Sequence, residues 1–277
     1  MSGRAPAEHL LWIGGWKEVS LVDVLENVSF TLWTAFCNLS CPWCANFKLA
    51  KGKERKLVSV EEIAAAVQET AAVVDYFHVT GGEPTLQYRP LARLLKLVRE
   101  TTGLKLSFDT NAMLPQALKH ILSEVSVDHV AVDVKAPLEN PLKYAAAAGV
   151  SAKNGEKVVE MVEEGLLSLS GRVPFLELRT TVVPSLLDEE DVQIIATEIA
   201  QMGLKAERLV YVVQQFIPYP DVPAEYRSLP ATPTHKLERA ASTAAQILNG
   251  VAEVWVRTLE QGSKRVSRPA SSAREGR

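Results

Sequence analysis

The sequence predicts an α/β fold in which about six strands alternate with helices and form one parallel sheet. Two observations predict it. Short segments rich in β-branched residues with apolar alternation recur along the chain, and segments with the apolar period of a helix lie between them. About six such units are fewer than the eight of a closed TIM barrel, so the sheet is expected to be open or only partly curled.

The predicted elements follow one another from residue 28 onward. Ser59 followed by Glu62 reads as a capping box that opens the first helix. The strands are expected at 28–35, 75–80, 104–109, 128–134, 174–183 and 208–216, with a further possible strand at 251–257. The helices are expected at 59–72, 88–101, 113–124, 151–169, 188–202 and 234–248.

No linker divides this pattern, which predicts a single domain over 1–261. Its core covers about 28–220, and a C-terminal helix and strand cover about 234–257. Residues 45–58 are expected to form a basic loop. Residues 262–277 are rich in Ser and Arg and have almost nothing to bury, so they are expected to form a disordered basic tail.

Composition excludes several classes of protein. The 277 residues are 47% hydrophobic and 23% charged, which is ordinary for a globular chain with a sizeable core. The formal net charge of −3 gives no global positive field, so neither nucleic acid nor a membrane surface is indicated as a partner. No apolar run approaches the roughly 20 residues needed to cross a bilayer, and the first residues lack the apolar stretch of a secretory signal. A cytoplasmic location is expected.

The three cysteines, Cys37, Cys41 and Cys44, form a C-x3-C-x2-C motif directly after the first strand. Such clustering in one loop is a poor disulfide framework and a good metal site. Three thiolates can hold an iron–sulfur cluster and leave one iron open to another ligand. A zinc site or three buried unliganded thiols are the alternatives, although structural zinc usually has four ligands and no fourth Cys or His lies nearby in sequence.

A second motif, Gly81-Gly82-Glu83-Pro-Thr, directly follows the second strand. Adjacent glycines at the carboxyl end of a strand allow positive φ and a close approach of the backbone to a ligand. In a parallel β/α fold, ligands bind at that end. A plain glycine turn is the alternative interpretation.

Polar residues also end the later strands, in segments reading DTN, DVKAP, ELRTTVVP and QQFIPY. Each alone could be a structural ion pair or a cap. Together they place polar groups at one edge of the sheet, as a ligand site requires. His78, inside a strand, is expected to be packed or hydrogen-bonded, whereas His120 and His235 are expected at surface or cap positions.

The cysteine motif with its aromatic residue before the last cysteine, together with GGEPTLQ, DTN and DVKAP, resembles the radical S-adenosylmethionine (SAM) superfamily. From about residue 28 to 220 the series is similar to glycyl-radical-enzyme activating enzymes, specifically the anaerobic ribonucleoside-triphosphate reductase activating protein. The resemblance implies a partial (β/α)6 TIM-like barrel that binds a [4Fe–4S] cluster and SAM. It implies reductive cleavage of SAM to methionine and a 5′-deoxyadenosyl radical.

The resemblance also assigns site residues. Cys37, Cys41 and Cys44 would bind the cluster, and no side chain would act as a separate catalytic acid, base or nucleophile. The residues that would bind SAM are Gly81, Gly82 and Glu83 at its amino group, Asp109 and Thr110 near its methionyl and ribose groups beside a monovalent cation, Asp133 and Lys135 at its carboxylate, and Arg179 near by.

The implied partners are a glycyl-radical protein as substrate and a flavodoxin- or ferredoxin-like electron donor. Related activating enzymes often have His-Asn after the last cysteine, where this chain has Ala45-Asn46, and this departure weakens the assignment of a particular target. Two rival functions stay open. One is a radical SAM enzyme acting on a small molecule or RNA, and the other is a non-catalytic protein that binds zinc or a cluster.

Overall fold

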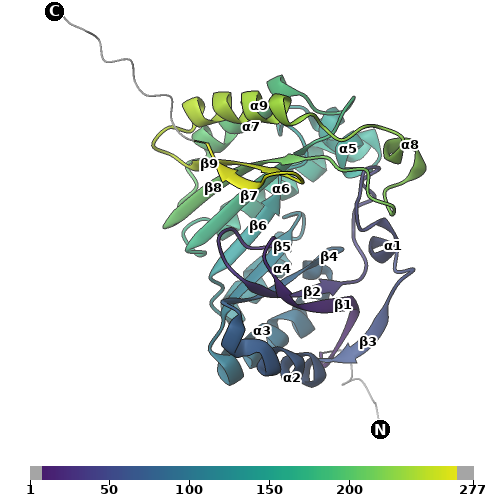
Figure 1. Ribbon diagram of the computed structural model, residues 1–277, viewed down its shortest axis with the longest axis vertical. Helices are drawn as coiled ribbons and strands as arrows, with labels where there is room; N and C mark the ends of the chain where they lie inside the picture. Colours follow the sequence, from purple (N-terminus) through teal and green to yellow (C-terminus); the bar gives the residue numbers. More distant parts are fainter. Residues whose placement is uncertain (1–7, 267–277) are drawn as a thin grey trace, which may run out of the picture.

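Parallel strands in chain order form the centre of the sheet (Figure 1). The computed structural model describes residues 8–266. Its ten-stranded sheet has the order β10-β9-β8-β7-β6-β5-β4-β2-β1-β3. The neighbours from β2 to β9 pair in parallel. These strands are β2 (Ser29–Thr34), β4 (Tyr76–Gly81), β5 (Lys105–Thr110), β6 (His129–Asp133), β7 (Phe175–Val182), β8 (Arg208–Gln215) and β9 (Glu253–Thr258).

The α/β fold and every strand and long helix expected from the sequence are confirmed. The helices pack on the outer side of the curved sheet (Figure 1). Ser59 caps the first of them by accepting a hydrogen bond from the backbone N–H of Glu62. The long helices are α2 (Val60–Thr70), α3 (Tyr88–Thr102), α4 (Pro115–Glu124), α6 (Gly155–Leu169), α7 (Glu189–Met202) and α9 (Thr234–Ile247).

The two faces of the sheet differ in chemistry because side chains alternate along each strand. One alternating set is apolar and fully buried against the helices, as Phe77 and Val79 show in β4. The other set is polar and faces the interior of the curved sheet; it includes His78 in β4, Asp109 in β5 and Arg179 in β7. Burial of the apolar set stabilises the fold, while the polar set is free to line a site.

Several elements were not expected from the sequence. β1 (Leu10–Ser20) pairs antiparallel with β2 and with β3 (Lys56–Ser59), so the expected basic loop contributes a strand. Gly14 and Gly15 lie at an irregularity in the pairing of β1 with β2, between Ile13 and Gly15. The short helices α1 (Phe47–Ala50), α5 (Pro141–Ala148) and α8 (Ala224–Arg227) and the 3-10 turns η1 (Ala71–Val73), η2 (Pro84–Gln87) and η3 (Ala152–Asn154) were also missed.

The disordered tail was predicted to begin at residue 262, which is too early in the chain. Its first residues form β10 (Gly262–Arg265), which pairs antiparallel with β9. The reason is that this pairing uses backbone groups and needs no apolar side chain, and all of β10 is exposed. Residues 267–277 of the expected tail lie outside the described residues.

The segment 21–28 between β1 and β2 bridges the two ends of the curved sheet, where β1 and β9 share no ladder (Figure 1). Leu25 packs against Phe175 of β7 and Trp255 of β9. Glu26 forms an ion pair with Arg208 at 2.8 Å. Side-chain contacts rather than backbone hydrogen bonds therefore close this seam. Among residues 8–266, no helix has both the length and the apolar composition to cross a membrane.

Candidate active site

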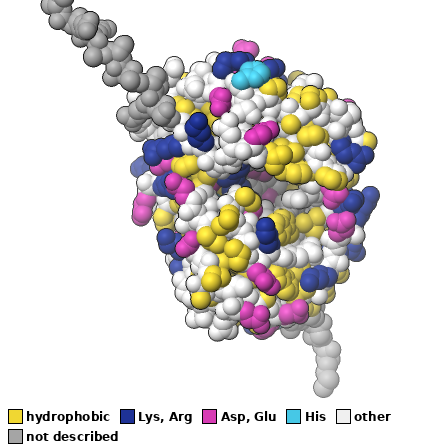
Figure 2. All heavy atoms as spheres, in the orientation of Figure 1, with side chains coloured by type: hydrophobic (Ala, Val, Ile, Leu, Met, Phe, Trp, Pro, Cys, Tyr) yellow, Lys and Arg dark blue, Asp and Glu magenta, His cyan; other side chains and the backbone are white. Residues whose placement is uncertain are grey.

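A cavity of about 740 Å³ opens at the carboxyl ends of the parallel strands, beside the segment 21–28. Figure 2 shows the hollow in the face of the molecule, with apolar side chains around it. Every site residue expected from the sequence lines this one cavity. They are Cys37, Cys41, Cys44, Gly81, Gly82, Glu83, Asp109, Thr110, Asp133, Lys135 and Arg179.

The three cysteines lie in the loop between β2 and α1, and none is in a disulfide. The loop is compact: the backbone N–H of Cys44 donates to the carbonyl of Cys41 at 3.2 Å. In residues 8–266, no three metal-ligating side chains converge on one point. Each cysteine of a cubane cluster binds a different iron, so a cluster site does not require such convergence.

Burial makes the thiolate forms of these cysteines unfavourable. It raises the pKa of Cys37 to about 12, with the Glu83 carboxylate adding to the shift. Burial and the neighbouring Cys41 raise the pKa of Cys44 to about 11, and burial also raises the pKa of Cys41. Bound iron would supply the compensating positive charge, as a metal does for a coordinating thiol. These donors therefore fit an iron–sulfur cluster.

The glycines of the second motif bring β4 against the cysteine loop. Gly81 has φ +114, and a Cβ there would lie 2.4 Å from the carbonyl oxygen of Thr34. A Cβ on Gly82 would lie 1.9 Å from the carbonyl oxygen of Phe36, the residue before Cys37. Side chains at either position would push the loop away, so the glycines serve the placement of the cysteines as well as ligand access.

Glu83 holds the ends of β4 and β5 together. Its side chain is only 1% exposed. The carboxylate accepts hydrogen bonds from Thr85, from the hydroxyl of Thr110 at 2.8 Å and from the backbone N–H of Asn111 at 2.7 Å. Burial raises its pKa, and these bonds act in the opposite direction. The carboxylate is thus engaged by its own chain, and its contact with SAM stays a prediction.

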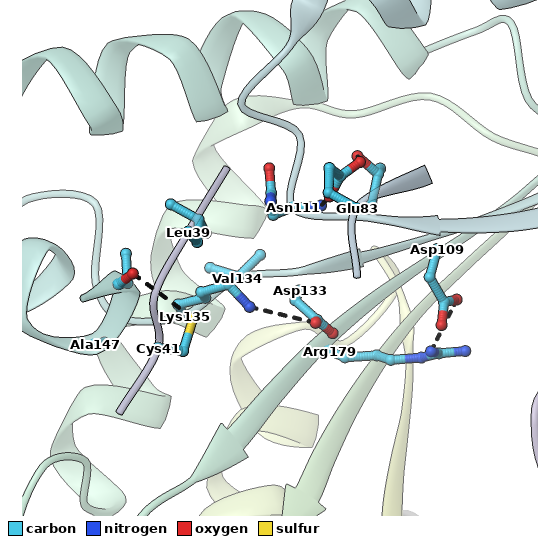
Figure 3. A network of polar contacts seen from close by, with 12 residues as sticks. Leu39, Cys41, Glu83, Asp109, Asn111, Asp133, Val134, Lys135, Ala147 and Arg179 are labelled. Carbon is cyan, nitrogen blue, oxygen red and sulfur yellow. Dashed lines mark hydrogen bonds and ion pairs between the residues drawn. The ribbon is translucent and has the colours of Figure 1, made fainter. Parts of the chain in front are cut away.

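Asp109 and Arg179 form an ion pair across the cavity floor at 3.0 Å (Figure 3). Asp109 also accepts from the hydroxyl of Thr80 at 2.8 Å. Burial raises the pKa of Asp109, but Arg179 and His78 outweigh it and hold the pKa well below its usual range. Arg179 further donates to Glu177 at 2.5 Å and to the carbonyl of Asp23 at 2.9 Å. Both side chains are fixed before any ligand binds.

Lys135 lies between the cysteine loop and Asp133. Its Nζ is 3.3 Å from Asp133 Oδ2 (Figure 3). It is also 5.2 Å from the centre of the Trp43 ring. Burial lowers the pKa of Lys135, but the nearby Cys41 and Asp133 raise it by more than burial lowers it. The amine is therefore held protonated. A buried ammonium at this position can attract a carboxylate and favour thiolates next to it.

A polar cluster below the cavity was missed by sequence reasoning. Ser107 Oγ bonds to Nδ1 of His78 at 2.7 Å and to Nδ1 of His129 at 2.8 Å. His129 Nε2 lies 3.3 Å from Glu177, which binds Arg179. Burial lowers the pKa of His129, although the neighbouring Glu177 acts in the opposite direction. The alternation of polar residues along three strands was the available signal, and the expectation that His78 is hydrogen-bonded is confirmed.

Comparison with known families shows to which family the chain belongs. The family model described as the radical SAM superfamily matches residues 31–197. The chain belongs to the radical SAM superfamily. Enzymes of this superfamily use a [4Fe–4S] cluster and SAM, so these two expected cofactors are confirmed together with the fold class, and the monovalent cation stays a prediction.

The chain is also similar to individual proteins of known name and to a solved structure. A protein of Methanocaldococcus jannaschii named as a glycyl-radical enzyme activating enzyme is 27% identical over 239 residues, which cover 86% of this chain and 94% of that protein. The 7-carboxy-7-deazaguanine synthase of Hyperthermus butylicus is 34% identical over 124 residues, covering 42% of this chain and 51% of the relative. The solved structure of the radical SAM methyltransferase TsrM from Kitasatospora setae aligns with a TM-score of 0.51 at 15% identity, covering 71% of this radical SAM chain and 38% of the methyltransferase.

Proposed function

We propose that this radical SAM enzyme generates a glycyl radical on a partner protein such as an anaerobic ribonucleoside-triphosphate reductase. The cluster and SAM, when bound, supply a 5′-deoxyadenosyl radical. That radical takes one hydrogen atom from the Cα of a glycine, which yields 5′-deoxyadenosine and leaves the unpaired electron on the partner. The observation that carries the proposal is the relative named as an activating enzyme, which this chain matches over 94% of its length.

The rim of the cavity supports a protein substrate. Leu21, Val22 and Leu259 line the cavity and are 73%, 69% and 67% exposed, and Tyr219 lines it at 44%. Apolar side chains gathered around an opening are typical of a surface that binds another protein or a ligand (Figure 2). The opening lies at the seam of the curved sheet, where a glycine-bearing loop can approach from the side.

The chain's own residues hold and orient the reactants. In this proposal, the three cysteines hold the cluster, Lys135 pairs with the carboxylate of SAM, and the backbone at Gly81 and Gly82 receives its amino group. The pair of Asp109 and Arg179 fixes the floor under the methionyl and ribose groups, with a monovalent cation near Asp109. No side chain has to exchange a proton with the substrate.

The single electron that starts the reaction comes from a partner of the flavodoxin or ferredoxin type in the cytoplasm under anaerobic conditions. The segment 45–58 supports this assignment. It carries Lys48, Lys51, Lys53, Arg55 and Lys56 against Glu54, in a chain whose net charge is −3. This segment directly follows the cysteine loop, and acidic surfaces are steered toward such basic segments.

The similarity to 7-carboxy-7-deazaguanine synthase favours one second candidate, a radical SAM enzyme that acts on a small molecule. That similarity covers less than half of this chain.

The test is performed on the anaerobically reconstituted enzyme with SAM and a reductant. A purified candidate glycyl-radical protein is added, and its glycyl radical is followed by EPR. The proposal predicts an EPR doublet in the partner together with one 5′-deoxyadenosine per radical. A partner whose radical glycine is changed to alanine is the control. SAM cleavage without a radical in any candidate partner would contradict the proposal and favour the small-molecule alternative.

A further inference from the structure

The helix α5 ends directly beside the cysteine loop, and the carbonyl groups of its last turn accept hydrogen bonds from two different segments. A helix leaves its last four carbonyl groups without partners inside the helix. In α5 the backbone N–H of Gly149 donates to Ala146 at 3.2 Å, and the N–H of Val150 donates to Ala145 at 3.0 Å. This pair of bonds is a Schellman motif, which satisfies two of the four carbonyls.

The two remaining carbonyls are satisfied by the cysteine loop. The backbone N–H of Ser40 donates to Ala148 at 3.1 Å, and the indole N–H of Trp43 donates to Ala147 at 3.0 Å. The sulfur of Cys41 lies 3.8 Å from the carbonyl oxygen of Ala148. The end of α5 therefore holds the residues on both sides of the central cysteine.

Gly149 makes this contact sterically possible. It has φ +66, and a Cβ at this position would lie 2.0 Å from the carbonyl oxygen of Ser40 and 2.9 Å from the backbone nitrogen of Cys41. Any residue other than glycine would clash with backbone atoms, which cannot move aside as a flexible side chain can. The loop and the helix end approach each other as closely as a residue without Cβ permits.

The other cysteines are held elsewhere. The backbone N–H of Cys37 donates to Ala50 at 3.0 Å, which ties the first cysteine to α1. Asn46, after the last cysteine, donates to the carbonyl of Gly81 at 3.2 Å. Each end of the loop thus has its own anchor, whereas Cys41 depends on α5.

The helix also connects the loop to the strand end that carries Lys135. The hydroxyl of Tyr144, on α5, accepts a hydrogen bond from the backbone N–H of Lys135 at 3.5 Å. Lys135 in turn places its ammonium over the ring of Trp43, whose indole N–H is bound to Ala147. A displacement of the last turn of α5 would move Cys41 and Lys135 relative to each other.

We propose that the C-terminal turn of α5, residues 147–149, is a positioning element for the cluster, with Gly149 as its positioning residue. The turn sets the place of Cys41 through the bonds to Ser40 and Trp43. It keeps the cluster loop in register with Lys135. Supporting groups that orient metal ligands typically change metal affinity about 10–100-fold when they are removed.

The test compares Gly149→Ala with Gly203→Ala in the anaerobically reconstituted full chain. Both glycines follow a helix with positive φ, +66 and +60, but a Cβ on Gly203 meets nothing within 4 Å. Both variants carry the strain of alanine in the left-handed region. Gly149→Ala also carries the clash of its Cβ with the carbonyl oxygen of Ser40, so its Tm is expected to fall at least as far as that of Gly203→Ala. Only Gly149→Ala is expected to lose bound iron and sulfide to half of the wild-type content or less, and to release iron to a chelator about 10-fold faster.

Equal iron content and equal release rates in the two alanine variants would overturn the proposal, because a merely structural glycine would affect them alike. Trp43→Phe provides a second measurement should Gly149→Ala not fold. It keeps a ring under Lys135 but removes the indole N–H bonded to Ala147. Trp16→Phe is its control, because Trp16 also lies under a lysine, Lys56, at 4.5 Å, and it does not line the cavity. Faster iron release from Trp43→Phe alone supports the proposal, and unchanged release refutes it.

Discussion

Replacement of Arg179 by methionine tests the electrostatics of the cavity floor. The guanidinium is buried, and it donates to Glu177 at 2.5 Å, to Asp109 at 3.0 Å and to a backbone carbonyl at 2.9 Å. Methionine keeps much of the volume but leaves Asp109 without its main cation, while Glu177 keeps Arg257 at 3.2 Å. Removal of one partner of a buried pair costs about 3–5 kcal/mol.

The loss of stability in Arg179→Met is expected to depend on pH. In the wild type the pKa of Asp109 lies below its unfolded value, so its contribution to stability is present above about pH 4 and is lost as the pH falls further. Without Arg179, the pKa of Asp109 should rise, because burial remains while only His78 and Thr80 still lower it. Asp109 of the variant then becomes protonated at a higher pH than Asp109 of the wild type. The difference in unfolding free energy between wild type and variant should therefore shrink from pH 8 to pH 4.

The assay is urea unfolding of both proteins at the two pH values, followed by far-UV circular dichroism. A loss of 3–5 kcal/mol corresponds to a fall in Tm of about 6–20 °C, at about 2–4 °C per kcal/mol. Arg239→Met is the matched control, because its pair with Glu189 is exposed and screened by solvent and should contribute little to stability. The double variant Arg179→Met with Asp109→Asn should regain part of the loss. A loss under about 1 kcal/mol in Arg179→Met, or no regain in the double variant, would refute the reasoning.

Three further predictions concern the cofactors. Gly82→Ala should displace the cysteine loop, because its Cβ would lie 1.9 Å from the carbonyl oxygen of Phe36. Iron analysis should then find a cluster content below half of that of the wild type. A full cluster content would show that the loop adapts. Lys135→Met should weaken SAM binding about 10–100-fold through loss of a charge-assisted contact of about 1.5–3 kcal/mol, measured by equilibrium dialysis; unchanged affinity would remove Lys135 from the SAM site. The thiols are protonated at pH 8, because their pKa values are raised to about 12 for Cys37 and about 11 for Cys44. Cluster assembly should therefore release protons, which pH-stat titration would detect, and it should become less favourable as the pH falls. Assembly yields that are independent of pH between 6.5 and 8.5 would contradict this prediction.

The sequence was sufficient to predict the parallel core because its strands and long helices have strong periodic patterns. β1 was missed because Gly14-Gly15 and the charged residues after it hide the strand pattern, and the strand is stabilised by partners on both sides. The helix α5 was missed because Tyr144 is followed by four alanines, which show no apolar period. In both cases tertiary contacts decide the local structure.

The site was predictable as a set but not in its internal contacts. The sequence placed all the polar strand ends at one edge, and the structure brings them into one cavity. It gave no means of seeing that Glu83 bonds to Thr110 and Asn111, or that Ser107 joins His78 to His129. Those contacts depend on the register between strands separated by whole helices, which local patterns do not encode.

The bridging segment 21–28 has a mechanical consequence. Each pair of neighbouring strands in the sheet is joined by a ladder of backbone hydrogen bonds, whereas β1 and β9 share none. Displacing the segment would break the ion pair of Glu26 and Arg208, the hydrogen bond from Arg179 to the carbonyl of Asp23 and the packing of Leu25. A substrate that entered at this seam would therefore leave the backbone ladders between the strands that carry the cofactor ligands intact.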